Sequence, residues 1–293
     1  MRKKNLSTRS GEQNTAVCIL IRDPVFEDSA DRLSVRLGLP VCRDPEAIGA
    51  TFGLALVPDA DGLSLFDGKM TLRGDFTHMQ SRLLPGKLPA ELLVRAAKLR
   101  DPGPCPVAID CTAGLGDDSL LLAAMGYTVH LFEYDPITAE LLDSALRKSR
   151  SSDSSGALSD ITNRMILHRE DSLAVLSALR ELPVRSKGEE TTSGQDPEPG
   201  AFPYVTYAPD LIYLDPMFPA RRKSGLITKK LQMLQMLENP CADESALLAA
   251  AVRANPRRIV IKRPLKGPFL ADIRPAYSIK GKAIRYDCIV VRG

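Results

Sequence analysis

The chain has 293 residues, of which 44% are hydrophobic and 26% charged, enough for one large domain or for a large and a small one. Its formal net charge is only +3, so composition alone does not require a polyanionic partner. The six cysteines form no C-x-x-C pair, and His78, His130 and His168 do not cluster, which argues against a metal site or a disulfide framework. The apolar run near the N-terminus is too short for a signal peptide, and no stretch approaches a membrane span. We therefore expect a soluble cytoplasmic protein with reduced thiols.

The first hundred residues are predicted to form a small α+β unit. Apolar runs at 16–21 and 51–57 indicate strands, and the spacing between them predicts a helix over 29–40 that ends near Gly38. Apolar residues alternate between 63 and 72, as in a hairpin that uses Gly62 and Gly68 as turn residues. A helix over 89–99 is expected to link this N-terminal unit, 1–100, to the rest of the chain.

Strands and helices alternate after the Pro-rich break at 101–106. The expected strands cover 107–110, 128–134, 164–171, 209–216, 257–264 and 284–293, and the expected helices cover 117–126, 137–149, 172–182 and 245–254. This alternation predicts a doubly wound, Rossmann-like α/β domain over 101–293, with a parallel sheet and an antiparallel strand near the end. Two polar segments, 149–160 and 185–200, are expected to be mobile surface loops.

A turn with Gly114 and Gly116 joins the first of these strands to a helix. Glycines at this place let backbone amides approach a ligand and direct a helix N-terminus toward it. Ser119 stands where a dinucleotide fingerprint has glycine or alanine, and the turn lacks the lysine of a phosphate-binding loop. Glu133 ends the next strand and can accept both hydroxyls of a ribose, so the turn and Glu133 together indicate ribose binding.

This order of acids and glycines is common to enzymes that bind S-adenosylmethionine, and an acid, Asp171 with Ser172, also follows the third strand. The ligand has no phosphate, which fits a turn without lysine. Its ammonium group can face one of three acids, namely Asp110, Asp117 or Asp118. Asp171 suits the adenine amino group, because an ionised carboxylate only accepts hydrogen bonds. S-adenosylmethionine is therefore the expected cofactor.

The fourth strand ends in Asp215-Pro216-Met217-Phe218, beside the switch point where such sheets bind ligands. The motif resembles the Asp-Pro-Pro-Tyr type of methyltransferases that act on exocyclic amino groups. The Asp215 carboxylate and the Pro216 carbonyl can accept the hydrogens of a weakly nucleophilic amino group and stabilise the charge that develops on nitrogen. Phe218 offers a ring on which an unpaired or flipped base can stack.

Positive charge is concentrated after this motif. Eleven Lys or Arg lie between residue 253 and the C-terminus, against two Asp, although the whole chain is near neutral. Such a concentration indicates contacts with phosphates. The expected RNA-binding residues are Arg221, Arg222, Lys223, Lys262 and Arg263.

Three segments, 110–136, 213–230 and 260–264, together resemble the bacterial RsmJ (YhiQ) family. Its members use S-adenosylmethionine to methylate N2 of a guanine in small-subunit (16S) ribosomal RNA, guanine 1516 in the family. The resemblance covers about residue 75 to the C-terminus. It implies a class I S-adenosylmethionine-dependent methyltransferase fold and a small-subunit RNA or 30S subunit as partner. The cofactor positions that it implies are Asp117, Asp118, Glu133, Tyr134, Asp171, Ser172 and Asp215.

The chain departs from the family in two places. Asp117 stands where the family usually has arginine or lysine, and only Arg82 and Lys87 remain of a usual basic run before the Rossmann-like domain. Other functions stay open. The Asp-Pro-x-aromatic logic also serves an amino methyltransferase of DNA or of protein glutamine. A third alternative is an RNA-binding module without catalysis, which the intact Asp215, Glu133 and glycines argue against.

Overall fold

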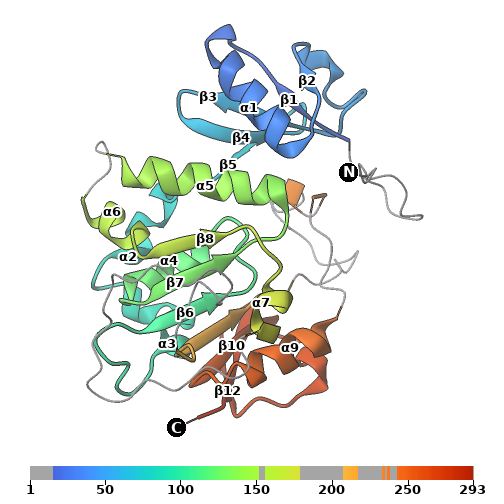
Figure 1. Ribbon diagram of the computed structural model, residues 1–293. Coiled ribbons are helices and arrows are strands. Elements are labelled where there is room, and N and C mark those ends of the chain that lie inside the picture. The colour runs from blue at the N-terminus through green and yellow to red at the C-terminus, as the bar shows by residue number, and fades with distance from the viewer. Residues whose placement is uncertain are drawn as a thin grey trace. The chain divides into compact units, whose positions relative to one another are not determined.

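The structure is a computed structural model that describes residues 16–151, 156–178, 207–216, 233–234, 236–237 and 243–292. The chain divides into two compact units, shown in Figure 1 and described here one at a time. The smaller unit contains the described residues up to Leu72, with the short described pieces 233–234 and 236–237. The larger unit begins at Arg73 and holds the remaining described residues.

The smaller unit is built on a five-stranded sheet with the order β2-β1-β3-β4-β5. Its strands are β1 Val17–Leu20, β2 Val41–Cys42, β3 Leu54–Asp59, β4 Gly62–Phe66 and β5 Thr71–Arg73. Helix α1, Glu27–Leu37, ends at Gly38, which takes the left-handed conformation (φ +67°) that glycine tolerates best. Two 3-10 turns, η1 Pro24–Phe26 and η2 Pro45–Ala47, complete the unit. The predicted strands, helix and hairpin are thus confirmed.

The segment between residues 73 and 100 packs with the larger unit. It contains η3 Thr77–Met79, α2 Gln80–Leu83, η4 Leu88–Ala90 and α3 Leu92–Ala97. The expected linking helix is therefore divided into two short elements, η4 and α3. Leu93 and Ala96 of α3 are buried in the core of the larger unit. Along the sequence, the boundary between the two compact units falls after Leu72. The domain boundary predicted after residue 100 stays a prediction.

The larger unit contains a seven-stranded sheet with the order β11-β12-β10-β9-β6-β7-β8. Its strands are β6 Val107–Asp110, β7 Thr128–Phe132, β8 Met165–His168, β9 Leu211–Leu214, β10 Arg258–Pro264, β11 Tyr277–Lys280 and β12 Ile284–Val290. Strands β6 to β10 pair in parallel, and β12 runs antiparallel to both β10 and β11. The doubly wound sheet is confirmed, with its switch point between β6 and β9. The short, half-polar β11 was not predicted.

Helices cover both faces of this sheet (Figure 1). They are α4 Asp117–Ala124, α5 Pro136–Arg150, α6 Gly156–Thr162, α7 Ser172–Ala178 and α9 Glu244–Arg253. Side chains alternate along a strand, so Tyr213 of β9 lies in the core beneath α3, α4 and α5, and Leu214 lies in the core beneath α7 and α9. In β10, Val260 faces the α4 side and Ile261 the α9 side. This alternation decides where the polar residues at the strand ends point.

One of the two predicted loops is helical at both of its ends. Segment 149–160 was expected to be a mobile loop, but α5 continues to Arg150 and α6 begins at Gly156. Leu158 of α6 is buried in the core, with Ile161 packed against that core, so apolar contacts stabilise a helix that the serine-rich composition hides. Residues 152–155 and the other predicted loop, 185–200, lie outside the described residues.

His130 and His168, which were expected not to cluster, are neighbours on β7 and β8. His130 Nδ1 and His168 Nε2 lie 2.9 Å apart, and the rings stack with a centroid distance of 5.2 Å. Burial lowers the pKa of each imidazole to about 4, so both are neutral at pH 7. Only the pairing register of the two strands brings them together. Across the described ranges, no group of three or more His, Cys, Asp or Glu could hold a metal ion.

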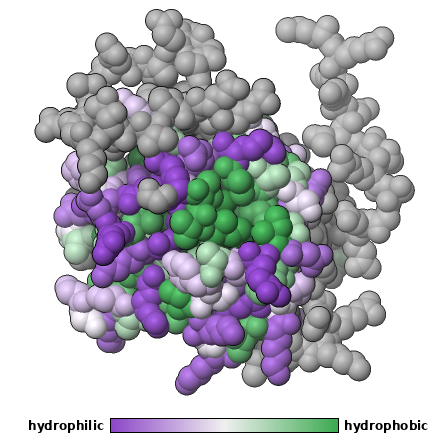
Figure 2. Space-filling view, turned by 90° about the horizontal axis from the view of Figure 1, so that it is seen from below, coloured by the Kyte–Doolittle hydropathy of each residue, from purple (hydrophilic) through white to green (hydrophobic). Residues whose placement is uncertain are grey.

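The surface of the closing segment keeps some apolar side chains exposed, among them Ile273, Tyr277 and Val290. Figure 2 shows an apolar area bordered by hydrophilic residues on the face seen from below. Exposed apolar side chains of this kind are ordinary in folded chains and do not by themselves mark a binding site. Among the described residues, no helix combines the length and the apolar character that crossing a membrane requires.

Candidate functional site

Charged side chains stand at the carboxyl ends of the parallel strands. They are Asp110 at the end of β6, Glu133 after β7, Asp171 after β8, Asp215 after β9 and Lys262 within β10. Parallel strands end at one edge of a sheet, so these residues share that edge, next to the switch point. The candidate site is therefore the carboxyl edge of the larger sheet, as the sequence predicted.

The glycine turn is shaped by two different requirements. At Gly116 (φ +85°), a Cβ would lie 2.8 Å from Leu142 Cδ1 and 3.2 Å from the Phe76 ring, so a side chain there would collide with the core. At Gly114 (φ +53°), no atom lies within 4 Å of the place that a Cβ would take. The turn is thus packed tightly on one side and open on the other, where a ligand can approach its backbone.

Glu133 holds this turn through its carboxylate. Its Oε2 accepts a hydrogen bond from the Gly114 amide at 2.9 Å, and its Oε1 accepts one from the Asp135 amide at 2.8 Å. Burial raises the pKa of Glu133 to about 7, although these two hydrogen bonds act in the opposite direction. Each carboxylate oxygen has a further lone pair, so Glu133 can still accept ribose hydroxyls. The adjacent Tyr134 side chain is exposed.

Asp110 fastens the start of the turn to helix α4. Its Oδ1 accepts the Thr112 amide at 3.0 Å, and its Oδ2 accepts the Ser119 hydroxyl at 2.5 Å. The carboxyl group is almost fully buried, and burial raises its pKa to about 7. Ser119, which the sequence marked only as a departure from the dinucleotide fingerprint, is therefore an internal partner of Asp110. A direct contact between Asp110 and a cofactor stays a prediction.

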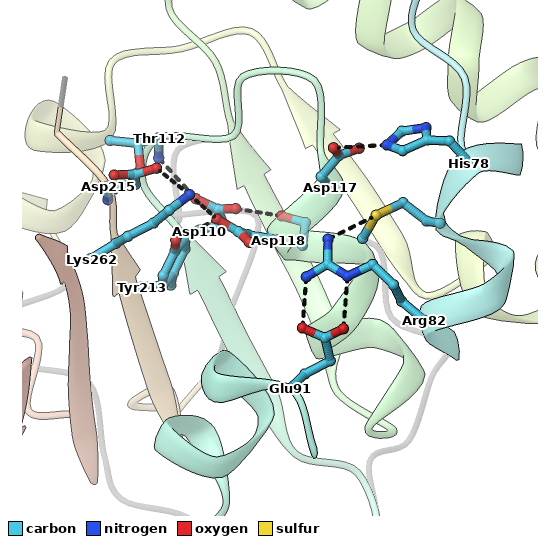
Figure 3. Close-up of polar contacts among 12 residues, drawn as sticks. His78, Arg82, Glu91, Asp110, Thr112, Asp117, Asp118, Tyr213, Asp215 and Lys262 are labelled. Carbon is cyan, nitrogen blue, oxygen red and sulfur yellow. Dashed lines mark hydrogen bonds and ion pairs between the residues drawn. The ribbon is translucent and has the colours of Figure 1, made fainter. Parts of the chain in front are cut away.

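Four residues from three elements form the Lys262 cluster, which consists of Asp118, Tyr213, Asp215 and Lys262 (Figure 3). The Lys262 ammonium lies 2.8 Å from Asp118 Oδ2 and 2.9 Å from Asp215 Oδ2. Asp118 Oδ2 also accepts the Tyr213 hydroxyl at 2.6 Å. The Asp215 amide donates to the Thr112 hydroxyl at 2.7 Å, which ties β9 to the glycine turn.

The opposite charges of this cluster favour each other's ionised form. Burial raises the pKa of Asp215, and the nearby Lys262 ammonium opposes that rise. Burial alone would lower the pKa of Lys262, but Asp118 and Asp215 outweigh it and raise that pKa above its usual value. Lys262 is therefore protonated at neutral pH. A carboxylate held in this way can accept hydrogen bonds from a polar group that enters the site.

The structure separates Lys262 from Arg263, which the sequence analysis had grouped as RNA-binding residues. Lys262 lies two residues after Val260 and so shares the α4 face, where it meets Asp118. Arg263 points to the other face, where it is 1% exposed and donates to the Pro268 carbonyl at 3.0 Å and to Glu244 at 3.3 Å. Neither side chain is a free surface cation.

The remaining predicted site residues differ in their exposure and in their partners. Asp117 is partly exposed, and its Oδ2 lies 3.1 Å from His78 Nε2. Asp171 is exposed and accepts the Leu173 amide at 2.9 Å, just before α7, where Ser172 is the first residue. Pro216 is buried next to Asp215. Phe218, Arg221, Arg222 and Lys223 lie outside the described residues, and their roles stay predictions.

Sequence analysis missed three residues of the site: Thr112, Tyr213 and His78. Tyr213 had a usable signal, because it precedes Asp215 by two residues in a strand and so must share its face. Thr112 and His78 had none, because their partners lie 103 and 39 residues away along the chain. Such contacts depend on strand order and on the path of the segment after residue 73.

The chain is similar in sequence to known S-adenosylmethionine-dependent methyltransferases. Residues 49–185 and 199–291 match the model of a family described as "Putative SAM-dependent methyltransferase". A protein of Pseudomonas savastanoi pv. phaseolicola named ribosomal RNA small subunit methyltransferase J is 33% identical over 267 residues, covering 89% of this chain and 86% of its own length. A protein of the same name from Dechloromonas aromatica is 32% identical over 269 residues, covering 90% and 96%.

A solved structure is similar over nearly the whole chain. It is the SAM-dependent methyltransferase NGO1261 from Neisseria gonorrhoeae, with a TM-score of 0.62 and 29% sequence identity. The similarity covers 94% of this chain and 96% of that one. The predicted class I methyltransferase fold is confirmed by this likeness together with the observed strand order.

Proposed function

Because the chain belongs to the family of ribosomal RNA small subunit methyltransferase J, whose members are S-adenosylmethionine-dependent methyltransferases, we propose that it methylates small-subunit ribosomal RNA. The target that we propose is the exocyclic N2 of a guanine. The names of the relatives support the RNA substrate. The Asp215-Pro216 motif supports an amino group as the acceptor, because both residues offer oxygens that accept its hydrogens.

The residues around the glycine turn fit S-adenosylmethionine. The open space at Gly114 admits a ligand close to the backbone, and the buried Glu133 carboxylate beside it retains lone pairs for ribose hydroxyls. Asp171 stands exposed at the same edge as an acceptor for an amino group. Glu133 would hold the ribose, Asp171 the adenine, and the turn amides the carboxylate of the methionine part.

The single observation that carries the proposal is the Lys262 cluster at the end of β9. When bound, S-adenosylmethionine would supply a methyl carbon on a cationic sulfur, and that sulfur would keep the electron pair of the C–S bond as the methyl group passes to the amino nitrogen. Asp215 and the Pro216 carbonyl accept the two amino hydrogens and orient the nitrogen lone pair. Positive charge grows on that nitrogen, and the Asp215 carboxylate stabilises it. The proton that nitrogen must lose then leaves to Asp215 and from there to water.

Part of the basic closing segment supports an RNA partner. Arg253, Lys266, Arg274, Lys280 and Lys282 are exposed, whereas Arg263 and Arg285 are buried. Exposed cations release counterions when they contact phosphates, so RNA binding should weaken as salt rises. Replacing Arg221, Arg222 and Lys223 together with Ala tests the predicted contacts next to the motif. A reduced dependence of RNA affinity on salt would support them, and an unchanged dependence would remove them from the proposal.

The direct test is methyl transfer in vitro. The purified protein with isotope-labelled S-adenosylmethionine is offered 16S ribosomal RNA, assembled 30S subunits, duplex DNA and a glutamine-containing protein extract. We expect label in RNA or 30S subunits, and nuclease digestion with mass spectrometry should identify N2-methylguanine. Label in DNA or protein alone would replace the proposed substrate. Binding of S-adenosylmethionine without transfer to any of these substrates would favour a module without catalysis.

A further inference from the structure

We propose that Lys262 is a positioning residue for the methyl transfer, because its ammonium keeps the Asp215 carboxylate ionised and fixes its orientation toward the amino group. The inference rests on the proposed function, which gives Asp215 the role of hydrogen-bond acceptor. It also replaces the expectation, drawn from the basic composition around residue 262, that this lysine contacts RNA phosphates.

The first support is the way in which Lys262 itself is held. Its ammonium has three N–H donors and no acceptor, and it lies within 2.9 Å of one carboxylate oxygen of Asp118 and of one of Asp215. Asp118 is anchored in turn by the Tyr213 hydroxyl at 2.6 Å. The Lys262 side chain is 27% exposed. A lysine that is held from two sides and largely covered is placed to serve Asp215 and not a phosphate outside.

The second support is the state in which this leaves Asp215. Oδ2 faces Lys262, and the backbone amide is tied to Thr112. Within the part of the chain that the structure describes, no hydrogen bond reaches Oδ1, while the side chain is 34% exposed. One oxygen is therefore fixed by the protein, and the other remains to accept a hydrogen from an entering amino group.

The third support is the balance of charge around Asp215. The titratable groups that interact electrostatically with it are Asp110 on β6, Asp118 on α4, Tyr213 on β9, Lys262 and the more distant Arg263 on β10, and Tyr286 on β12. Lys262 is the cation in contact with it, since Arg263 points to the opposite face and pairs with Glu244. Without Lys262, Asp118 and Asp215 would repel each other, and the Asp215 carboxyl would take up a proton more readily. A protonated carboxyl is a poorer acceptor and stabilises less positive charge.

The experiment compares Lys262→Met, which removes the charge, with Lys262→Arg, which keeps it. Lys98→Met is the matched control, because Lys98 is exposed and its carbonyl accepts Arg258 at the amino end of β10, away from the site. Methyl transfer is measured against pH with saturating S-adenosylmethionine. For Lys262→Met we expect the acidic limb of the pH profile to move up by about 1–3 pH units, the usual effect of an adjacent opposite charge on a carboxyl.

Lys262→Arg should keep the limb near its wild-type position even if its rate is lower, and the control should match the wild type. A Lys262→Met protein with the wild-type pH profile would overturn the proposal. So would an equal loss of rate at every pH, and so would a flatter salt dependence of RNA binding with an unchanged profile, the signature of a phosphate contact.

A second variant covers the case in which Lys262→Met does not fold. Lys262→Met with Asp118→Asn removes the carboxylate that would be left without its cation. Loss of the Asp118 charge opposes the shift, but Lys262 acts on Asp215 more strongly than Asp118 does, so the acidic limb should still lie above the wild-type limb, by less than in Lys262→Met. A limb at the wild-type position would overturn the proposal.

A carbon-13 NMR titration of the Asp215 carboxyl, assigned with Asp215→Asn, distinguishes failure of the Lys262 role from failure of the proposed function. If wild-type protein transfers no methyl group to RNA, the proposed function fails. The titration still decides on Lys262, because its removal must raise the pKa of Asp215 and an unchanged pKa refutes the role.

Discussion

Two charged clusters of the larger unit have opposite relations to solvent. In the Arg285 cluster, formed by Ser278, Arg285 and Asp287, the guanidinium is 6% exposed and donates to Asp287 at 2.9 Å. It also donates to the carbonyls of Pro264, Leu265, Gly267 and Pro268. In the Lys262 cluster the side chains of Asp118, Lys262 and Asp215 remain 18%, 27% and 34% exposed. A buried charge alone therefore does not identify a site, whereas the exposed part of the Lys262 cluster is open to a ligand, as the proposed function requires.

The largest effect is expected from a substitution that disrupts the Arg285 cluster. Arg285→Met leaves Asp287 and several carbonyls buried without their donor, and losing one partner of a buried ion pair costs about 3–5 kcal/mol of stability. The free energy of unfolding in urea should fall by that amount, while turnover per folded molecule stays near the wild-type value. Lys282→Met, an exposed lysine on the loop before β12, is the control. A loss of turnover without a loss of stability would mean that the Arg285 cluster belongs to the site.

The next largest effect is expected from a substitution in the Lys262 cluster. Asp215→Ala removes a preorganised electrostatic partner of the reacting nitrogen, so turnover should drop by about 10²–10³ while S-adenosylmethionine binding and RNA affinity persist. Single-turnover methylation, with folding checked by circular dichroism, measures this change, and Asp160→Ala on α6 is the exposed control. A normal rate in folded, cofactor-loaded Asp215→Ala would reduce Asp215 to a turn residue.

Glu133 tests the proposed cofactor contact at the same carboxyl edge of the larger sheet. Glu133→Ala should weaken S-adenosylmethionine binding, since each hydrogen bond to a charged group contributes about 1.5–3 kcal/mol. Glu133→Gln keeps an acceptor oxygen and should weaken binding less. Calorimetry measures both variants, with Glu46→Ala in the smaller unit as the exposed control. Equal affinities for the wild type and Glu133→Ala would refute the ribose assignment.

At pH 7 the His130 and His168 pair gives the smallest effect, because its contribution to stability changes only as the pH falls. Both imidazoles have a pKa of about 4 in the folded chain, against about 6.5 when unfolded. Their neutral forms stabilise the fold fully above pH 6.5, and this contribution is lost as pH falls toward 4. Between pH 7 and 5 the loss is about 2 kcal/mol for each imidazole.

A double variant isolates this contribution, because Asp110 and Glu133 titrate with the opposite sign and remain in both proteins. The free energy of unfolding of His130→Gln/His168→Gln should fall less steeply over this pH range than that of the wild type. Parallel curves would show that the pair has no depressed pKa values.

The sequence predicted the strands of the larger sheet well, because buried parallel strands are short apolar runs between turn residues. It also predicted that Asp110, Glu133 and Asp215 share one edge, since that follows from strand direction alone. Element ends that depend on packing were less accessible. Helix α6 is one example, where Leu158 outweighs the serines around it.

Pairings across the sheet could not be predicted in the same way. The contact of His130 with His168 depends on the register between β7 and β8. The contact of Lys262 with Asp118 depends on the placement of the first turn of α4 next to β10. The alternation of β10 nevertheless offered a signal. Val260 and Lys262 share a face, as do Ile261 and Arg263, so the two cations had to diverge. The cations of the closing segment therefore do not form one continuous basic patch.

The hydrogen bond between the Asp215 amide and Thr112 joins residues 103 positions apart, and the ion pair between Lys262 and Asp118 joins residues 144 apart. Loops of this size close slowly compared with helices and hairpins, so we expect the site to form late in folding. During synthesis, no ribosome-bound chain can complete the Lys262 cluster until residue 262 has left the exit tunnel. A fragment that stops before β10 lacks Lys262, and with it the cation that contacts Asp215.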